Sequence, residues 1–114
     1  MANAHNMTLR DLHGILRGVG IPVAHYEAEL DNYPYIVFNE LGTTYSAASG
    51  QVWREVTRIG IDHYTKTEWD ASLDELKKIL LENKLKFTTA TIWYVDTKVI
   101  HTQIDLSIAR DMEV

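Results

Sequence analysis

The sequence contains no cysteine and only two prolines among its 114 residues. The missing thiols exclude a disulfide framework and a thiolate metal site, and they fit a reducing compartment. No apolar run approaches the ~18 residues that a membrane-spanning helix needs, so we expect no membrane partner. The first residues, MANAHNMTLRDLH, lack an apolar core flanked by a basic end. We therefore expect no secretory signal there.

Basic residues are also in short supply. Eleven Lys and Arg stand against sixteen Asp and Glu, which leaves a formal net charge of −5. Affinity for a phosphate backbone comes from Lys and Arg, so this balance argues against sequence-specific binding of nucleic acid. With 46% hydrophobic and 24% charged residues, the composition is that of one ordinary globular domain, which we place at residues 1–114.

The first helix is predicted at about residues 8–19. Thr8 is suited to the N-cap, and Asp11 stands three residues later, where its carboxylate meets free backbone N–H groups. Gly20 provides the stop, and Pro22 prevents continuation. The apolar residues recur at helical spacing: Leu9, Leu12, Ile15, Leu16 and Val19.

The second helix is predicted at about residues 68–82. Either Thr67 or Asp70 can cap its first turn, and Asn83 is suited to a left-handed end. Its predicted buried stripe consists of Trp69, Leu73, Leu76, Ile79 and Leu80.

Strand signals fill most of the remaining chain. Residues 35–38 are β-branched or aromatic without alternation, which predicts a strand buried on both faces. Residues 52–64 alternate, which predicts one inward face and one wet face. Residues 87–95 and 99–108 flank the tight turn 96–98 and form the closing hairpin.

A short segment at 23–26 is a candidate edge strand. The predicted fold is therefore α+β, with two helices packed on a mainly antiparallel sheet of four to five strands. The predicted order is α-β-β-β-α-β-β. We expect residues 1–7 and 110–114 to be frayed.

Residues 42–51, GTTYSAASGQ, carry no charge and contain mostly small side chains between two glycines. This composition predicts a flexible hairpin loop. A long neutral loop in a small domain either connects two strands or is ordered by a partner, and both interpretations stay open. As an assembly loop, its contact residues are Thr43, Thr44, Tyr45, Ser46, Ala47, Ala48, Ser49, Gly50 and Gln51.

The sequence offers no constellation of catalytic groups. The five histidines show neither HxH nor HxxxH spacing, so no metal site is expected. Asp62 and His63 are neighbours on a predicted strand and must point to opposite faces. Ser46 and Ser49 lack the GxSxG context of an activated nucleophile. We expect no catalytic, cofactor-binding or metal-binding residues and a protein that is not an enzyme.

Three segments carry a family resemblance: the strand YPYIVFNE at 33–40, the strand end IDHYTK at 61–66, and the helix DELKKILLEN at 74–83. With the order of elements, they make the chain similar, over about residues 8–108, to the small tail-completion proteins of long-tailed bacteriophages and prophages. These are tail terminators and head–tail joining proteins. The resemblance does not separate these two from a neighbouring minor capsid protein.

The resemblance implies a structural protein that is monomeric in solution and assembles as a ring, usually of six subunits, at the end of a tail. The implied partners are further copies of the chain and tail-tube or connector proteins. The implied locations are the host cytoplasm during assembly and then the virion. An acidic ring would also let DNA slide through its lumen without sticking, because like charges repel.

Two other function classes stay open. The first is a small-ligand-binding or enzymatic α+β domain, with a pocket between the second helix and the sheet lined by His63, Tyr64 and Tyr94. The second is a nucleic-acid module, which would show salt-dependent binding.

Overall fold

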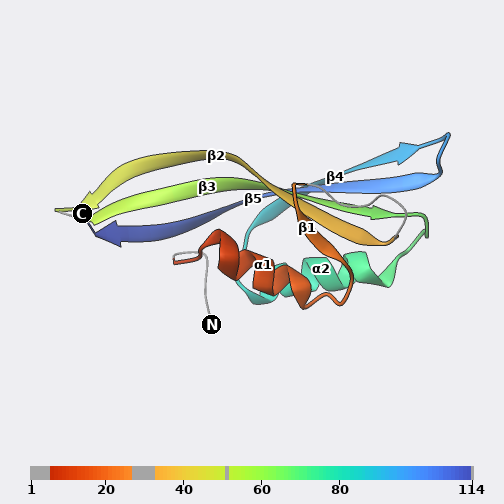
Figure 1. Ribbon diagram of the computed structural model, residues 1–114, viewed down its shortest axis with the longest axis horizontal. Helices are drawn as coiled ribbons and strands as arrows, with labels where there is room; N and C mark the ends of the chain where they lie inside the picture. Colours follow the sequence, from red (N-terminus) through yellow and green to blue (C-terminus); the bar gives the residue numbers. More distant parts are fainter. Residues whose placement is uncertain (1–5, 27–32, 51, 114) are drawn as a thin grey trace.

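The computed structural model describes residues 6–26, 33–50 and 52–113, which form two helices and one five-stranded sheet (Figure 1). In chain order the elements are α1 (Leu9–Arg17), β1 (Val23–His25), β2 (Tyr35–Ser49), β3 (Val52–Thr65), α2 (Ala71–Glu82), β4 (Phe87–Tyr94) and β5 (Val99–Glu113). The predicted α+β class and the order α-β-β-β-α-β-β are confirmed. Among the described residues, no helix is both long and apolar enough to cross a membrane.

The sheet has the strand order β1-β2-β3-β5-β4. The edge strand β1 runs parallel to β2, and every other neighbouring pair is antiparallel. The sheet is therefore mainly antiparallel, as predicted. Both helices lie on the same face of this sheet, and no helix of the described residues covers the other face (Figure 1).

The molecule is long, with extents of 53 × 24 × 22 Å. At one end, strands β2, β3 and β5 continue together beyond both helices, and at the other end the β4–β5 hairpin projects past α2 (Figure 1). The predicted loop at 42–51 is wrong: residues 42–49 belong to β2 and pair with β3 from Gly42 opposite Arg58 to Ser49 opposite Val52. Small neutral residues are compatible with a strand wherever a partner strand is available.

The hairpin connection shrinks to a tight turn after Ser49. Gly50 adopts φ +53, a conformation that glycine reaches without the steric cost of a Cβ. Gln51, the last residue of the predicted loop, lies outside the described residues.

The predicted fraying is also wrong where the structure describes it. The backbone N–H of Met7 donates to the carbonyl of Ala109 at 2.8 Å, and β5 continues to Glu113 beside β3. Backbone pairing to a neighbouring segment holds these residues in place. Residues 1–5 and 114 are outside the described part.

Helix α1 begins as predicted. Thr8 and Asp11 form a reciprocal capping box, with N–H to oxygen distances of 3.1 Å and 2.9 Å. This local hydrogen bonding lowers the pKa of Asp11. The helix ends at Arg17, two residues before the predicted end, and Gly20 then turns the chain at φ +88.

Helix α2 begins three residues later than predicted, with Asp70 rather than Thr67 at its N-cap. The Asp70 carboxylate accepts from the backbone N–H of Ser72 at 2.8 Å and from the Thr65 hydroxyl. Trp69 therefore precedes the helix at φ +60, and 90% of it is exposed. Its predicted place in the buried stripe is wrong. Lys84 rather than Asn83 adopts the left-handed conformation after the helix.

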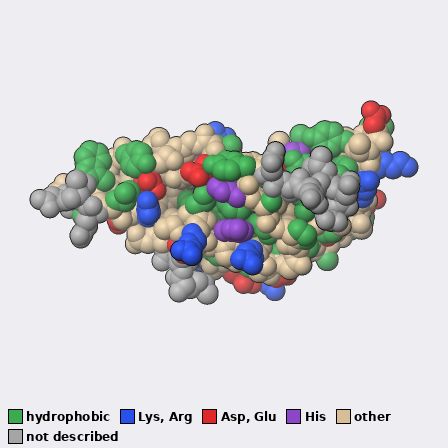
Figure 2. Space-filling model, viewed as in Figure 1, with side chains coloured by type: hydrophobic (Ala, Val, Ile, Leu, Met, Phe, Trp, Pro, Cys, Tyr) green, Lys and Arg blue, Asp and Glu red, His purple; other side chains and the backbone are tan. Residues whose placement is uncertain are grey.

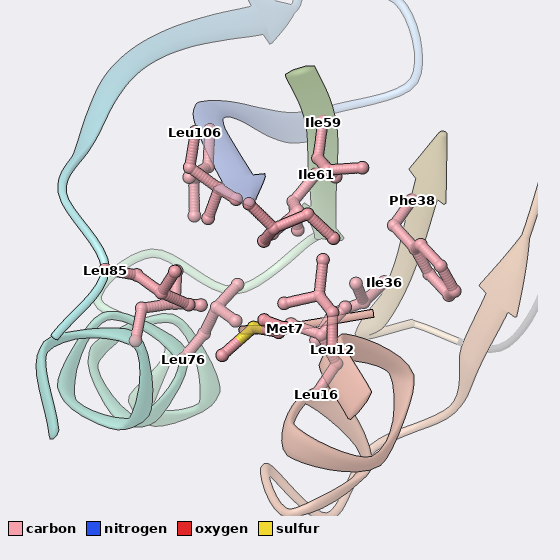
Figure 3. Close-up of a cluster of buried hydrophobic side chains, with 13 residues drawn as sticks. Met7, Leu12, Leu16, Ile36, Phe38, Ile59, Ile61, Leu76, Leu85 and Leu106 are labelled. Atoms are coloured by element: carbon pink, nitrogen blue, oxygen red, sulfur yellow. The ribbon is translucent and has the colours of Figure 1, made fainter. Parts of the chain in front are cut away.

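The core lies between the two helices and the sheet (Figure 3). Alternate residues of β3 face it, as predicted, and residues 35–38 of β2 are buried on both faces. The buried cluster consists of Met7, Leu12, Leu16, Ile36, Phe38, Ile59, Ile61, Leu76, Leu80, Leu85, Ile104, Leu106 and Ile108.

Two adjacent leucines on α2 provide a test of which side chains form the core. Leu80 is fully buried in the core, whereas 61% of Leu81 is exposed. We expect Leu80→Ala to lower the free energy of unfolding by about 2–5 kcal/mol, because it leaves a cavity. The control Leu81→Ala should change it by less than about 0.5 kcal/mol. Urea unfolding followed by circular dichroism measures both, and equal effects would contradict the packing.

Candidate assembly surface

The candidate site is the part of the sheet that extends past the helices, here called the arm. It comprises residues 42–49 of β2, 52–58 of β3 and 107–113 of β5. A register irregularity between Glu40 and Gly42 marks its beginning on β2. Such a bulge bends the strand and increases its twist. Within the arm, β3 pairs with β2 on one side and with β5 on the other. This pairing fixes the backbone from which the side chains of β2 project.

The predicted assembly residues lie along the outer strand of the arm. Thr43, Tyr45 and Ala47 alternate with Thr44 and Ser46, so they point to opposite faces, and all five are exposed. The Thr43 hydroxyl lies 3.2 Å from that of Thr57, which places Thr43 on the helix side of the sheet.

Of the remaining members of that predicted set, Ala48, Ser49 and Gly50 lie at the tip of the arm. The backbone of Ala48 and Ser49 continues β2, and Gly50 makes the turn. Gln51 is not described. The structure thus places residues 43–49 of the set along one strand edge instead of in a loop.

Charges on the arm are confined to β3 and β5. Arg54 lies opposite Asp111 and Glu55 lies opposite Arg110, with nitrogen–oxygen distances of 3.1 Å and 3.0 Å. Residues 42–49 carry no charge. The charged residues of β3 and β5 pair across the two strands. Strand β2 therefore offers a neutral edge of the arm, whereas the opposite edge, on β5, carries charges.

A hollow of about 370 Å³ lies beside the arm on the helix side. Its lining includes Thr8, Tyr45, Glu55 and Arg110. The Glu55 carboxylate raises the pKa of Tyr45, first through a hydrogen bond and then through its charge. Because Glu55 is also paired with Arg110, these two charges of the hollow neutralise each other. The hollow therefore provides a polar contact surface without net charge from this pair.

A second exposed region lies at the opposite end of the molecule. The hairpin of β4 and β5 presents Ile92, Trp93, Tyr94 and Val95, and 62% of Trp93 is exposed. The uncharged run from Phe87 to Val95 was a sequence signal for a strand. Its exposure was not predicted, because the run does not show that β4 would be the last strand of the sheet.

The alternative pocket near His63, Tyr64 and Tyr94 is contradicted by the strand geometry. His63 faces α2, and its Nε2 lies 2.8 Å from the Ser72 hydroxyl oxygen. Tyr64 and Tyr94 lie on the face without helices. The sheet separates the three side chains, so they cannot line one pocket.

The face without helices instead holds a hydrogen-bonded Asp62–His101–Tyr94 cluster. His101 Nε2 lies 2.7 Å from Asp62 Oδ1, and its Nδ1 lies 3.1 Å from the Tyr94 hydroxyl. The imidazole stacks on Tyr64 with ring centroids 4.3 Å apart. Both ring nitrogens are occupied, so the cluster joins β3, β4 and β5. Sequence reasoning missed it, although it correctly separated Asp62 from His63.

The same face carries a row of stacked aromatic rings. Tyr35 stacks on Tyr64 with centroids 4.9 Å apart, and Tyr33 lies 5.4 Å from Tyr35. Desolvation raises the pKa of Tyr35 to about 12. These rings cover β2 and β3 where no helix does, which explains why Tyr35 is buried.

The described residues contain no group of three or more His, Cys, Asp or Glu side chains that could hold a metal ion. Comparison with known proteins identifies no relative: no protein-family model matches the chain, and no curated protein matches its sequence.

The buried His63 generates a prediction about pH. Burial lowers its pKa below the ordinary 6.5, and its Nδ1 has no hydrogen-bond partner among the residues that the structure describes. The unfolded chain therefore takes up a proton that the folded chain resists. The His63 contribution to stability should be complete above pH 6.5 and should decline as the pH falls through the lowered folded-state pKa.

His63→Gln removes this titration and keeps an amide donor for Ser72. The difference in unfolding free energy between wild type and His63→Gln should be constant above neutral pH. Below neutral pH, the wild type should lose stability relative to His63→Gln. Urea titrations between pH 4.5 and 8 would measure this difference, in the range where histidine titrates. Parallel pH profiles would contradict the assignment.

Proposed function

We propose that this chain is a structural, non-enzymatic protein that completes a phage or prophage tail or head–tail junction by forming a ring. The observation that carries the proposal is the arm, whose neutral outer strand projects beyond the helices and is exposed throughout its described side chains. The resemblance of residues 33–40, 61–66 and 74–83 to tail-completion proteins supplies the biological setting.

The three segments that carry the resemblance form one unit of the fold. Residues 35–38 of β2 pair directly with residues 61–64 of β3, and α2 packs on that pair. The Thr65 hydroxyl donates to Asp70 and so joins β3 to α2. The Lys66 ammonium lies 5.0 Å from the centre of the Tyr33 ring. Each of these contacts holds β2, β3 and α2 together, which favours a structural protein.

The arm would make contacts with neighbouring subunits or with the tail. Arg54 and Glu55 of β3 are already paired with Asp111 and Arg110 of β5, so docking on the arm would not leave these charges buried without partners in an interface. Exposed aromatic side chains such as Tyr45 and Trp53 are the residue types that dominate interface energetics. The net charge of −5 suits a lumen through which DNA passes.

The ligand-binding or enzymatic alternative has less support. Its proposed pocket residues lie on opposite faces of the sheet, and His101 already uses both of its ring nitrogens. A nucleic-acid module would need accessible cations beside the exposed aromatic side chains. The arm instead carries Arg54 and Arg110 in ion pairs. At the other end, Trp93 shares a hollow with Lys66 and Lys98, but Glu68 lines the same hollow and the chain as a whole is acidic.

Electron microscopy can test the proposal. The purified chain, mixed with tail tubes or connectors encoded by the same genome, should form rings at their ends. Tyr45→Ala should weaken this attachment about tenfold or more, since truncation of a central interface tyrosine costs at least about 2 kcal/mol.

Leu81→Ala provides a matched control, because Leu81 and Tyr45 are both 61% exposed and Leu81 lies on α2. It should attach like the wild type. Absence of rings and of tube binding by the wild-type chain would overturn the proposal. Equal attachment by Tyr45→Ala and Leu81→Ala would remove Tyr45 from the contact surface.

A further inference from the structure

The sheet has two long edges that carry neither charge nor proline. The first is the outer edge of β2 along residues 42–49. The short strand β1 covers β2 only from Ile36 to Phe38, and within the described residues no strand pairs with the outer side of β2 beyond that point. The backbone N–H and C=O groups that point outward there are available to a partner strand.

The second edge is that of β4. This strand is the last of the sheet, has eight residues and is exposed from Thr88 to Tyr94. Exposed edges of natural proteins are usually protected by charges, prolines or a covering element. Neither of these two edges contains a charge or a proline. A monomer with two such edges is poorly protected against pairing, which indicates that a strand covers each of them in the assembled state.

Exposed apolar side chains gather beside both edges. Tyr45, Trp53 and Met112 lie on the arm, where Figure 2 shows green side chains at the left end. Ile92, Trp93, Tyr94 and Val95 lie on the β4–β5 hairpin at the other end. A strand added at either edge would bury part of this surface and so add hydrophobic stabilisation to the backbone hydrogen bonds.

We propose that β4 of one copy pairs with residues 42–49 of β2 in a second copy, so that the sheets join head to tail. This inference deepens the ring function proposed above and rests on it. In each contact, the β2 edge of one copy is therefore covered by the β4 edge of its neighbour. Each copy uses both edges once, and such a head-to-tail contact closes into a ring when the rotation between successive copies adds up to a full turn.

The topology gives this pairing its direction. Strand β2 is antiparallel to β3, β3 is antiparallel to β5, and β5 is antiparallel to β4. Strand β4 is therefore antiparallel to β2, and a neighbour in the same orientation presents β4 antiparallel to the arm. Antiparallel pairing is the more stable arrangement per residue.

The neighbouring copy must also be shifted along the strands. Strand β4 pairs with residues 99–106 of β5, whereas the arm begins at residue 107. The shift is about eight residues, or about 25 Å. It places the β4–β5 hairpin of one copy beside the arm of the next. A two-fold pairing of β4 with β4 would instead close a dimer and leave both β2 edges uncovered.

Cysteine cross-linking tests the pairing, because the chain has no cysteine of its own. The variant Ala47→Cys/Thr91→Cys places one thiol on each edge, both on the helix side of the sheet. The full-length protein is treated with a short bis-maleimide, alone and with tail tubes, and separated on a denaturing gel. We expect a ladder of dimers, trimers and larger species.

The single variants Ala47→Cys and Thr91→Cys should give no ladder and no dimer. The control Ala47→Cys/Lys78→Cys, with its second thiol on the exposed side of α2, should also remain monomeric on the gel. A dimer from Thr91→Cys alone would overturn the inference in favour of two-fold β4 pairing. Equal ladders from both double variants would overturn it as well.

Electron microscopy of the same samples separates the two proposals. Rings on tail tubes without cross-linking of the edge pair would overturn the inference and leave the proposed function standing. A specific ladder without rings or tube attachment would support edge pairing and overturn the proposed function. The absence of both would overturn both.

Discussion

The rest of the structure depends on the register of β3, which pairs with β2 and β5 along its whole length. A shift of one residue in this register would turn every β3 side chain to the other face of the sheet. Ile59 and Ile61 would leave the core, and Asp62 would lose its hydrogen bond with His101 on the face without helices. The two faces of the molecule therefore follow from a single set of backbone hydrogen bonds.

The end of β3 also positions α2. Thr65 is the last residue of the strand, and its hydroxyl donates to the N-cap carboxylate of Asp70. Ser72 donates its hydroxyl proton to the same carboxylate, so the hydroxyl oxygen accepts from His63 Nε2. These hydrogen bonds lower the pKa of Asp70 against the opposing effect of its burial. A polar chain of four residues thus determines where the helix begins and which side chains it lays on the sheet.

The arm has a different energetic character from the body. The body is stabilised by the core beneath the helices, which the arm reaches only through Ile108 and the buried Thr57. The rest of the arm depends on strand pairing and on cross-strand ion pairs such as Glu55 with Arg110. Partly exposed ion pairs contribute little, about 0–1 kcal/mol each. A partner strand along β2 would therefore stabilise the arm substantially more than its own charges do.

The sequence by itself determined the features that depend on neighbours along the chain. The Thr8–Asp11 capping box, the alternation of β3 and the separation of Asp62 from His63 all follow from local spacing. Tertiary structure decided the rest. Residues 42–49 became a strand because β3 offered backbone partners, and Trp69 stayed exposed because Thr65 held Asp70 at the cap. The neutral edge of the candidate site was visible as composition, but its form required strand pairing, which joins residues far apart in the sequence and leaves no local signal.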